Sequence, residues 1–259
     1  MAGGRVAGIL VALAAAGPVS TWPDRLVEQC REVTEMTGVG IALSGAAGLA
    51  GVLAATGGHA QRMEDLQFTI GEGPCVDAST SGRPVLCPDI PLEGAARWPA
   101  YASGAAEAGI AAAFTFPLQV GAIAVGVLDL YRDSRGPLTG RQVDDAVAFA
   151  DAAVAVLLYL QERADGRAGG PDGSVGPPEL VDRRAVVHQA VGMISVQVDV
   201  GVAEALLRLR AHAYGQNRPV VDVATDVVAR RLRFDDSDAG TSQGSGGPDP
   251  DDDPEGAPG

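Results

Sequence analysis

The sequence predicts an α+β protein in which an antiparallel sheet with flanking helices is followed by a small three-helix bundle. Over residues 24–162, short apolar runs separated by turn residues alternate with helical patterns, which is typical of a sheet covered by helices. Residues 163–178 are rich in Gly and Pro and predict a flexible linker. Three helical patterns follow this linker. The chain of 259 residues is therefore long enough to build two separate cores.

The N-terminal extension, residues 1–23, carries an apolar run at residues 6–16. Val6, Ile9, Leu10 and Leu13 are three or four residues apart, which favours a helix that packs this face on a core. The alternative is a signal peptide, because Arg5 precedes the run and small residues end it. The run is too short for a membrane span, so no membrane partner is expected.

Three cysteines without close pairs fit neither a disulfide framework nor a zinc site, which predicts a cytoplasmic protein. Among the three histidines and the scattered acids, no metal cluster, paired carboxylates or Ser-His-Asp set is recognisable. The sequence therefore predicts no metal site and no enzyme.

Each element of the first domain, residues 24–162, follows from its apolar spacing and its turns. The clearest pair of strands meets across Gly121 as a hairpin. A wide apolar stripe from residue 139 to residue 162 predicts one long helix. The remaining predicted helices cover residues 24–37, 59–68, 75–78 and 98–108, and the predicted strands cover residues 39–44, 49–55, 84–87, 113–120 and 123–131.

The second domain, residues 179–234, contains predicted helices at 182–197, 201–215 and 219–232. A bundle of this size is near the lower limit for independent stability, so we expect a homodimer. The net charge of the chain is −14, but this domain holds eight arginines against six acids. Attraction to phosphate depends on such a local field, so the total charge does not exclude a nucleic-acid partner.

Residues 235–259 hold eight acids, no base and no apolar cluster, which predicts a disordered tail. It is either a solvated tail or an electrostatic decoy that competes with nucleic acid for the arginines.

Three ordered motifs occur in the second domain: Gln189-Ala190 with Gly192-Met193; Glu204-Ala205-Leu206 with Leu209-Arg210 and Ala213; and Asn217-Arg218, Asp222-Val223-Ala224 and Val227-Val228. In this order they resemble the ANTAR family of transcription antitermination regulators. The resemblance implies a domain that binds RNA hairpins. Val191 stands where members usually carry a cation, which calls one phosphate contact into question.

The cationic surface of this domain suits unpaired RNA, because arginine and aromatic side chains stack on bases and arginine forms bidentate hydrogen bonds to phosphate. The alternative to RNA contact is that the arginines are only solvated and the alanines only pack the helices together. A second alternative is that the domain is a DNA-binding helix-turn-helix. The candidate RNA-binding residues are Gln189, Arg208, Arg210, His212, Tyr214, Asn217 and Arg218; Arg230, Arg231 and Arg233 extend the cationic surface.

The first domain contains Gly71-Glu72-Gly73-Pro74-Cys75, Arg83-Pro84-Val85, Arg97-Trp98-Pro99 and a hairpin from Phe116-Pro117-Leu118 to Gly126-Val127-Leu128-Asp129-Leu130. Together they resemble the GAF domain, a sensor module often fused to ANTAR outputs. The resemblance implies a small-molecule ligand in a cavity over the sheet, but it names no cofactor or signal. The candidate ligand-binding residues are Glu72, Cys75, Asp77, Trp98, Phe114 and Phe116, each of which also suits a turn or the core.

Cys75 begins a short helix after a Gly-Pro turn, where amide dipoles can favour a thiolate. With Cys87 it would form a redox pair, as in the free methionine sulfoxide reductases built on a GAF scaffold; the alternative is a buried structural cysteine. The sequence as a whole predicts an RNA-binding antitermination regulator. In it a GAF domain senses a ligand or redox state, and the helix at 139–162 couples that state to paired ANTAR domains. A GAF-type thiol redox enzyme is the alternative.

Overall fold

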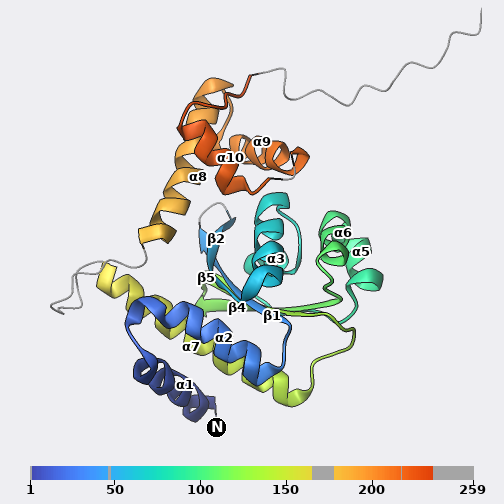
Figure 1. Cartoon of the computed structure of the whole chain (residues 1–259), viewed down its shortest axis with the longest axis vertical. Helices are drawn as coiled ribbons and strands as arrows, with labels where there is room; N and C mark the ends of the chain where they lie inside the picture. The colour runs from blue at the N-terminus through green and yellow to red at the C-terminus, as the bar shows by residue number, and fades with distance from the viewer. Residues whose placement is uncertain (1, 46–47, 165–177, 217, 236–259) are drawn as a thin grey trace, which may run out of the picture.

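The computed structural model describes residues 2–45, 48–164, 178–216 and 218–235. A five-stranded antiparallel sheet in the order β2-β1-β5-β4-β3 organises the first part of the chain (Figure 1). We call residues 2–164 the sheet domain and residues 178–235 the bundle. The predicted linker and acidic tail fall almost entirely outside the described residues. The bounds of the strands are β1 Gly38–Gly45, β2 Gly48–Ala55, β3 Val85–Cys87, β4 Ala112–Val120 and β5 Ile123–Arg132.

The strands lie where apolar runs and turns predicted them. β4 and β5 form the predicted hairpin, with Val120 opposite Ile123 and Gly121 at φ 62° in the turn. β1 joins this hairpin to β2, because it pairs with β5 along one edge and with β2 along the other. The predicted α+β fold is confirmed.

One face of the sheet is covered by α2 and α7, with α1 packed outside α7 (Figure 1). Ile9 and Leu13 of α1 are buried in the same apolar cluster as Phe149 of α7, and Arg5 pairs with Asp145 at 3.2 Å. This packing agrees with the predicted apolar face. The bounds are α1 Ala2–Ala16, the 3-10 turn η1 Val19–Thr21, α2 Trp22–Thr34 and α7 Gly140–Ala164.

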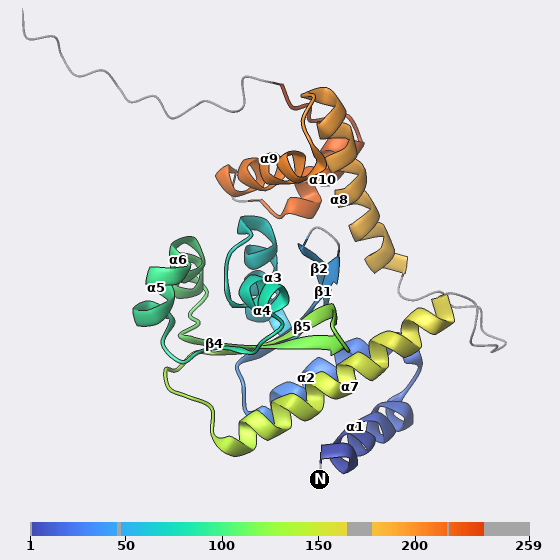
Figure 2. The ribbon, with the colours of Figure 1, turned by 180° about the vertical axis from the view of Figure 1, so that it is seen from behind.

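The opposite face carries α3 and α4, with η2, α5 and α6 beside them (Figure 2). Gly71, at φ 71°, ends α3, and Pro74 starts α4 after Gly73 at φ 131°. The tight turn predicted at Gly71–Pro74 therefore redirects the chain across this face. The bounds are α3 Gly57–Ile70, α4 Pro74–Ser81, the π-helical turn η2 Ile90–Gly94, α5 Ala95–Arg97 and α6 Pro99–Glu107.

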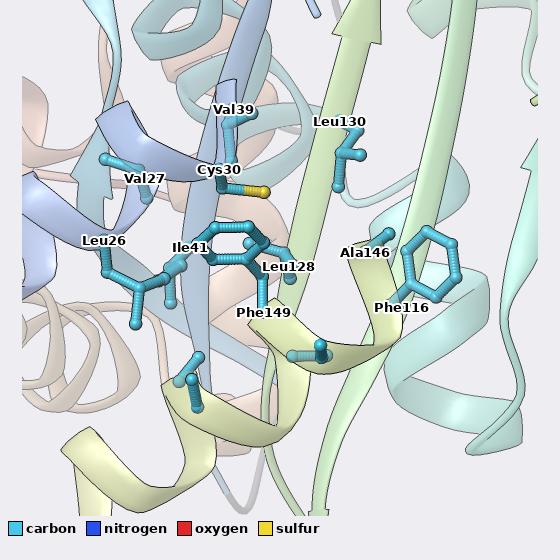
Figure 3. Packing of buried hydrophobic residues seen from close by; sticks show 14 of the residues in the cluster. Leu26, Val27, Cys30, Val39, Ile41, Phe116, Leu128, Leu130, Ala146 and Phe149 are labelled. Atoms are coloured by element: carbon cyan, nitrogen blue, oxygen red, sulfur yellow. The ribbon is translucent and has the colours of Figure 1, made fainter. Parts of the chain in front are cut away.

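The core on the α2 and α7 side is aliphatic and aromatic. Figure 3 shows Leu26, Ile41 and Leu128 around the Phe149 ring, with Phe116 beside Ala146 of α7. Leu128 and Leu130 reach this face because side chains alternate along β5. Asp129 and Tyr131 therefore face α3 and α4.

The bundle consists of α8 Pro178–Gln197, α9 Val202–Gly215 and α10 Val220–Val228, and it lies next to α3 and β2 (Figure 1). The predicted third helix, to residue 232, was too long. Helix α10 ends at Val228 because Arg230 turns into the left-handed region at φ 59°, and the amides of Arg231 and Leu232 bond back to the Asp226 carbonyl.

Candidate functional site

A buried polar cluster lies between the sheet and α3. It consists of Glu64, Gln67, Thr115, Asp129 and Tyr131, all fully or almost fully buried. The Tyr131 hydroxyl donates to Glu64 Oε1 at 2.8 Å and accepts from Gln67 Nε2 at 2.9 Å. Thr115, opposite Asp129 on β4, donates its hydroxyl to the Asp129 carboxylate. Two strands and one helix therefore meet in a single hydrogen-bonded network.

Glu64 and Asp129 share this network as two buried carboxyls. Burial raises the pKa of Asp129 to about 7, and burial together with the nearby Asp129 charge raises the pKa of Glu64 well above its ordinary value. Glu64 Oε2 and Asp129 Oδ2 are buried without a hydrogen-bond partner. The two carboxyls interact with each other and titrate as a pair, and their burial favours a state in which they share a proton.

Two glycines make room for the cluster. A Cβ on Gly40, which pairs with Asp129 across β1 and β5, would lie 2.0 Å from Glu64 Oε1. A Cβ on Gly73 would lie 2.5 Å from Gln67 Oε1, the atom that accepts the Cys75 amide at 2.9 Å. Larger residues at either position would displace the side chains that form the network.

Sequence reasoning missed Glu64 and Asp129. One sequence signal pointed to Asp129, a carboxylate in the middle of the apolar strand Val127-Leu128-Asp129-Leu130, and none pointed to Glu64.

The predicted ligand-binding residues do not form one site. Cys75 is buried beside the polar cluster, where Gln67 binds its amide. Glu72 accepts the amides of Ala100 and Tyr101 at 2.7 and 3.0 Å, so it holds the first turn of α6. Asp77 pairs with Arg97 at 2.8 Å and accepts the Trp98 ring N–H at 3.2 Å.

Phe114 and Phe116 lie on the other face of the sheet. Both belong to the apolar core with α2 and α7, as Figure 3 shows for Phe116. Strand alternation places them opposite to Thr115, which faces the polar cluster. The structure therefore separates these two rings from Cys75.

The predicted thiolate at Cys75 is not supported. Burial, reinforced by the nearby Asp129 and Glu64 charges, raises the pKa of the Cys75 thiol well above its ordinary value. This outweighs the dipole of the short helix α4. All three cysteines are free and buried, and Cys75 and Cys87 belong to different apolar clusters.

The predicted RNA-binding residues of α9 point in two directions. Arg208 and Arg210 are two positions apart, so they lie on opposite sides of the helix. Arg208 pairs with Glu204 at 2.8 Å, and the His212 ring packs on Phe234 with centroids 5.1 Å apart. Arg210 and Tyr214 instead face the sheet domain.

A cleft of about 340 Å³ lies beside the contact between α9 and α3, and residues of α6 also line it. Tyr214 and Arg218 line its bundle side, and Arg62 and Glu107 line its sheet-domain side. Arg218 pairs with Asp226 at 2.6 Å. Gln189 is exposed on α8, and Asn217 lies outside the described residues.

The described residues contain no group of three or more His, Cys, Asp or Glu side chains arranged to hold a metal ion. Within the same ranges, no single helix is both long and apolar enough to cross a bilayer, although the bent pair of α8 and α9 passes by length and composition.

The chain resembles several solved structures at low sequence identity. No curated protein matches the chain. Among solved structures, the GAF domain of a phosphoenolpyruvate-protein phosphotransferase from Acinetobacter is 13% identical with a TM-score of 0.49, and the match covers 64% of this chain and 97% of that one. The corresponding domain from Coxiella burnetii is 16% identical with a TM-score of 0.48, covering 64% and 96%. A free methionine-R-sulfoxide reductase from Neisseria meningitidis is 15% identical with a TM-score of 0.42, covering 60% and 86%.

Two family models match the chain in order. The GAF domain model matches residues 23–158, most of the sheet domain, and the ANTAR domain model matches residues 179–228, most of the bundle. The GAF match alone spans more than half of the sequence. The chain therefore belongs to the GAF domain family and joins this sensor domain to an ANTAR domain.

Proposed function

We propose that this protein is an RNA-binding regulator of transcription antitermination. In this proposal the bundle binds RNA hairpins and the sheet domain senses a small-molecule or redox signal. The observation that carries it is the ANTAR match over residues 179–228, since ANTAR is an RNA-binding antiterminator domain. The function needs no catalysis, and the raised pKa of the buried Cys75 thiol argues against a redox enzyme.

Within the bundle, we assign the RNA-binding face to Arg210, Tyr214 and Arg218. They combine two guanidinium groups with a half-exposed phenol ring on one side of α9 and the turn after it. Arg binds phosphate oxygens through parallel hydrogen bonds, and Tyr stacks on unpaired bases. Arg208 and His212 face away from this side and are engaged by Glu204 and Phe234.

In the sheet domain, we infer that the signal acts at the face of the sheet under α3 and α4. Cys75 and the Glu64–Asp129 pair lie there, whereas Phe114 and Phe116 belong to the opposite core. Glu72, Asp77 and Trp98 would act indirectly, by fixing the start of α6.

We further infer a cytoplasmic homodimer. Free, buried cysteines suit a reducing compartment. The bundle also leaves Val196, Val202 and Leu207 largely exposed, and several large exposed apolar side chains on so small a domain favour a partner copy.

The direct test is selection of RNA by the purified full chain from a random hairpin pool, with duplex DNA as competitor. We expect enrichment of hairpins that share a loop sequence, and binding that weakens as salt rises. Absence of enrichment at low ionic strength would contradict RNA binding. A preference for duplex DNA would favour the helix-turn-helix alternative.

A further inference from the structure

The bundle docks on the sheet domain through an apolar contact. Helices α8 and α9 contact β2 and α3, respectively. Leu49 of β2 and Phe68 of α3 belong to one apolar cluster with Val191, Leu209 and Ala213 of the bundle. The two domains therefore share a core at this boundary, so their arrangement is held by burial of apolar surface.

Arg210 is a charged residue that packs against this apolar contact. Its guanidinium carbon lies 5.6 Å from the centroid of the Phe68 ring, and its Nε is buried without a hydrogen-bond partner. A Cβ on Gly71 would come within 3.2 Å of Arg210 Nη1. The absence of a side chain at Gly71, which ends α3, therefore leaves room for the Arg210 guanidinium. Because its Nε is buried, Arg210 cannot use this atom to bind a phosphate oxygen in the docked arrangement.

The other two residues of the proposed RNA-binding face lie at the same boundary, with Tyr214 54% exposed. Tyr214 and Arg218 line a cleft whose opposite wall is formed by α3 and α6. Its volume of about 340 Å³ is at the small end of the range for small-molecule pockets, and a folded hairpin cannot enter it. All three residues are therefore turned toward the sheet domain in this arrangement.

We propose that the sheet domain and RNA compete for the same face of α9, so that the docked arrangement is the RNA-free state of the protein. This rests on the proposed function, because it assumes that Arg210, Tyr214 and Arg218 contact RNA. A signal that weakens docking raises RNA affinity. By linkage, RNA binding favours release of the bundle by the same factor.

The test weakens docking from the side of the sheet domain, so that the bundle keeps every RNA-binding residue. Phe68→Ala in the full chain removes the ring under Arg210, and Leu49→Ala weakens the β2 contact if Phe68→Ala fails to fold. Leu86→Ala, at an exposed position on β3, is the matched control. Two quantities are measured for each variant: affinity for the selected hairpin, and the rate at which phenylglyoxal modifies Arg210, read by peptide mass spectrometry.

We expect Phe68→Ala or Leu49→Ala to speed modification of Arg210 and to tighten RNA binding about fivefold or more, with Leu86→Ala unchanged in both. The competition proposal is overturned if a variant that still binds RNA shows faster modification of Arg210 but the same affinity for the hairpin as the wild type. It is also overturned if wild-type Arg210 reacts as fast as the exposed Arg83. If every variant exposes Arg210 yet none binds RNA, the proposed function itself fails.

Discussion

The Tyr131 hydroxyl donates a 2.8 Å hydrogen bond to Glu64, and this contact joins the central strand β5 to α3 across a buried acid pair. Glu64 Oε2 and Asp129 Oδ2 are buried without a hydrogen-bond partner, and burial favours a proton shared by the two carboxyls. The stability of the sheet domain is therefore linked to pH.

We predict that the protein becomes less stable as pH rises from about 4 to about 7. The native pKa values of Glu64 and Asp129 lie above those of the unfolded chain, so in this window the native state binds more protons and loses stability with rising pH. Each unit of pKa difference corresponds to about 1.4 kcal/mol. Urea unfolding at a series of pH values measures the slope. Glu64→Gln should flatten it, whereas the exposed control Asp133→Asn should not; an unchanged slope in Glu64→Gln would contradict the shared proton.

Substitution of Gly40 should destabilise the protein through Glu64. Gly40→Ala places a methyl group where Glu64 Oε1 lies, and such overpacking costs about 1–3 kcal/mol. Gly8→Ala, with open space around the new methyl group, serves as the control and should be neutral or stabilising. In a double-mutant cycle, Glu64→Ala should relieve part of the cost of Gly40→Ala. Strict additivity of the two free energies would rule out this contact.

Leu13→Ala tests the packing of α1 on α7. Leu13 is 2% exposed, so its truncation should lower the free energy of unfolding by about 2–5 kcal/mol. Val11, on the same helix, is 69% exposed, and Val11→Ala should change stability by less than about 0.5 kcal/mol. If chemical denaturation showed equally small changes in the free energy of unfolding for Leu13→Ala and Val11→Ala, α1 would not pack on the core. The signal-peptide alternative requires that result.

Arg218→Ala should lower the dependence of RNA affinity on salt. Loss of one phosphate contact reduces the slope of log K against log salt by up to about one unit. Because Arg218 also pairs with Asp226, Asp226→Asn is the control: it breaks the ion pair but keeps the cation, and should not reduce the slope. Fluorescence anisotropy with a selected hairpin gives the slopes, and an Arg218→Ala slope equal to that of wild type removes Arg218 from the RNA-binding face.

The cysteines should not react in the native state. Burial raises the pKa of the thiols of Cys30, Cys75 and Cys87, to about 12 for Cys30, so thiolate is scarce at neutral pH. Titration with a chromogenic disulfide reagent should detect no thiol in the native protein and three in denaturant. Rapid reaction of native Cys75 would restore the redox alternative.

Most helices and strands could be predicted from the sequence because their signals are local. The three- and four-residue spacing of α7 and the Gly121 turn of the β4–β5 hairpin each fix one element without reference to the rest of the chain. The end of α10 depends instead on the backbone of Arg230, which has a positive φ. Arginine does not favour this conformation, so the residue type could not predict it.

The candidate site was less predictable because it depends on packing between distant segments. Alternation along β4 separates Phe114 and Phe116 from Thr115, but the sequence does not say which face α3 covers. Glu64 and Asp129 meet only when α3 crosses the sheet. The burial of Arg210 depends in turn on how the bundle docks, which no local pattern records.

Helix α3 presents Glu64 and Gln67 to the strands, while Phe68 and Gly71, the residues next in line, meet Arg210. In the proposed function, the residues at which the signal acts and the residues that hold the bundle therefore lie about one helical turn apart on α3. On that proposal, a bundle transferred to a foreign receptor domain would stay under control only if α3 were transferred with it.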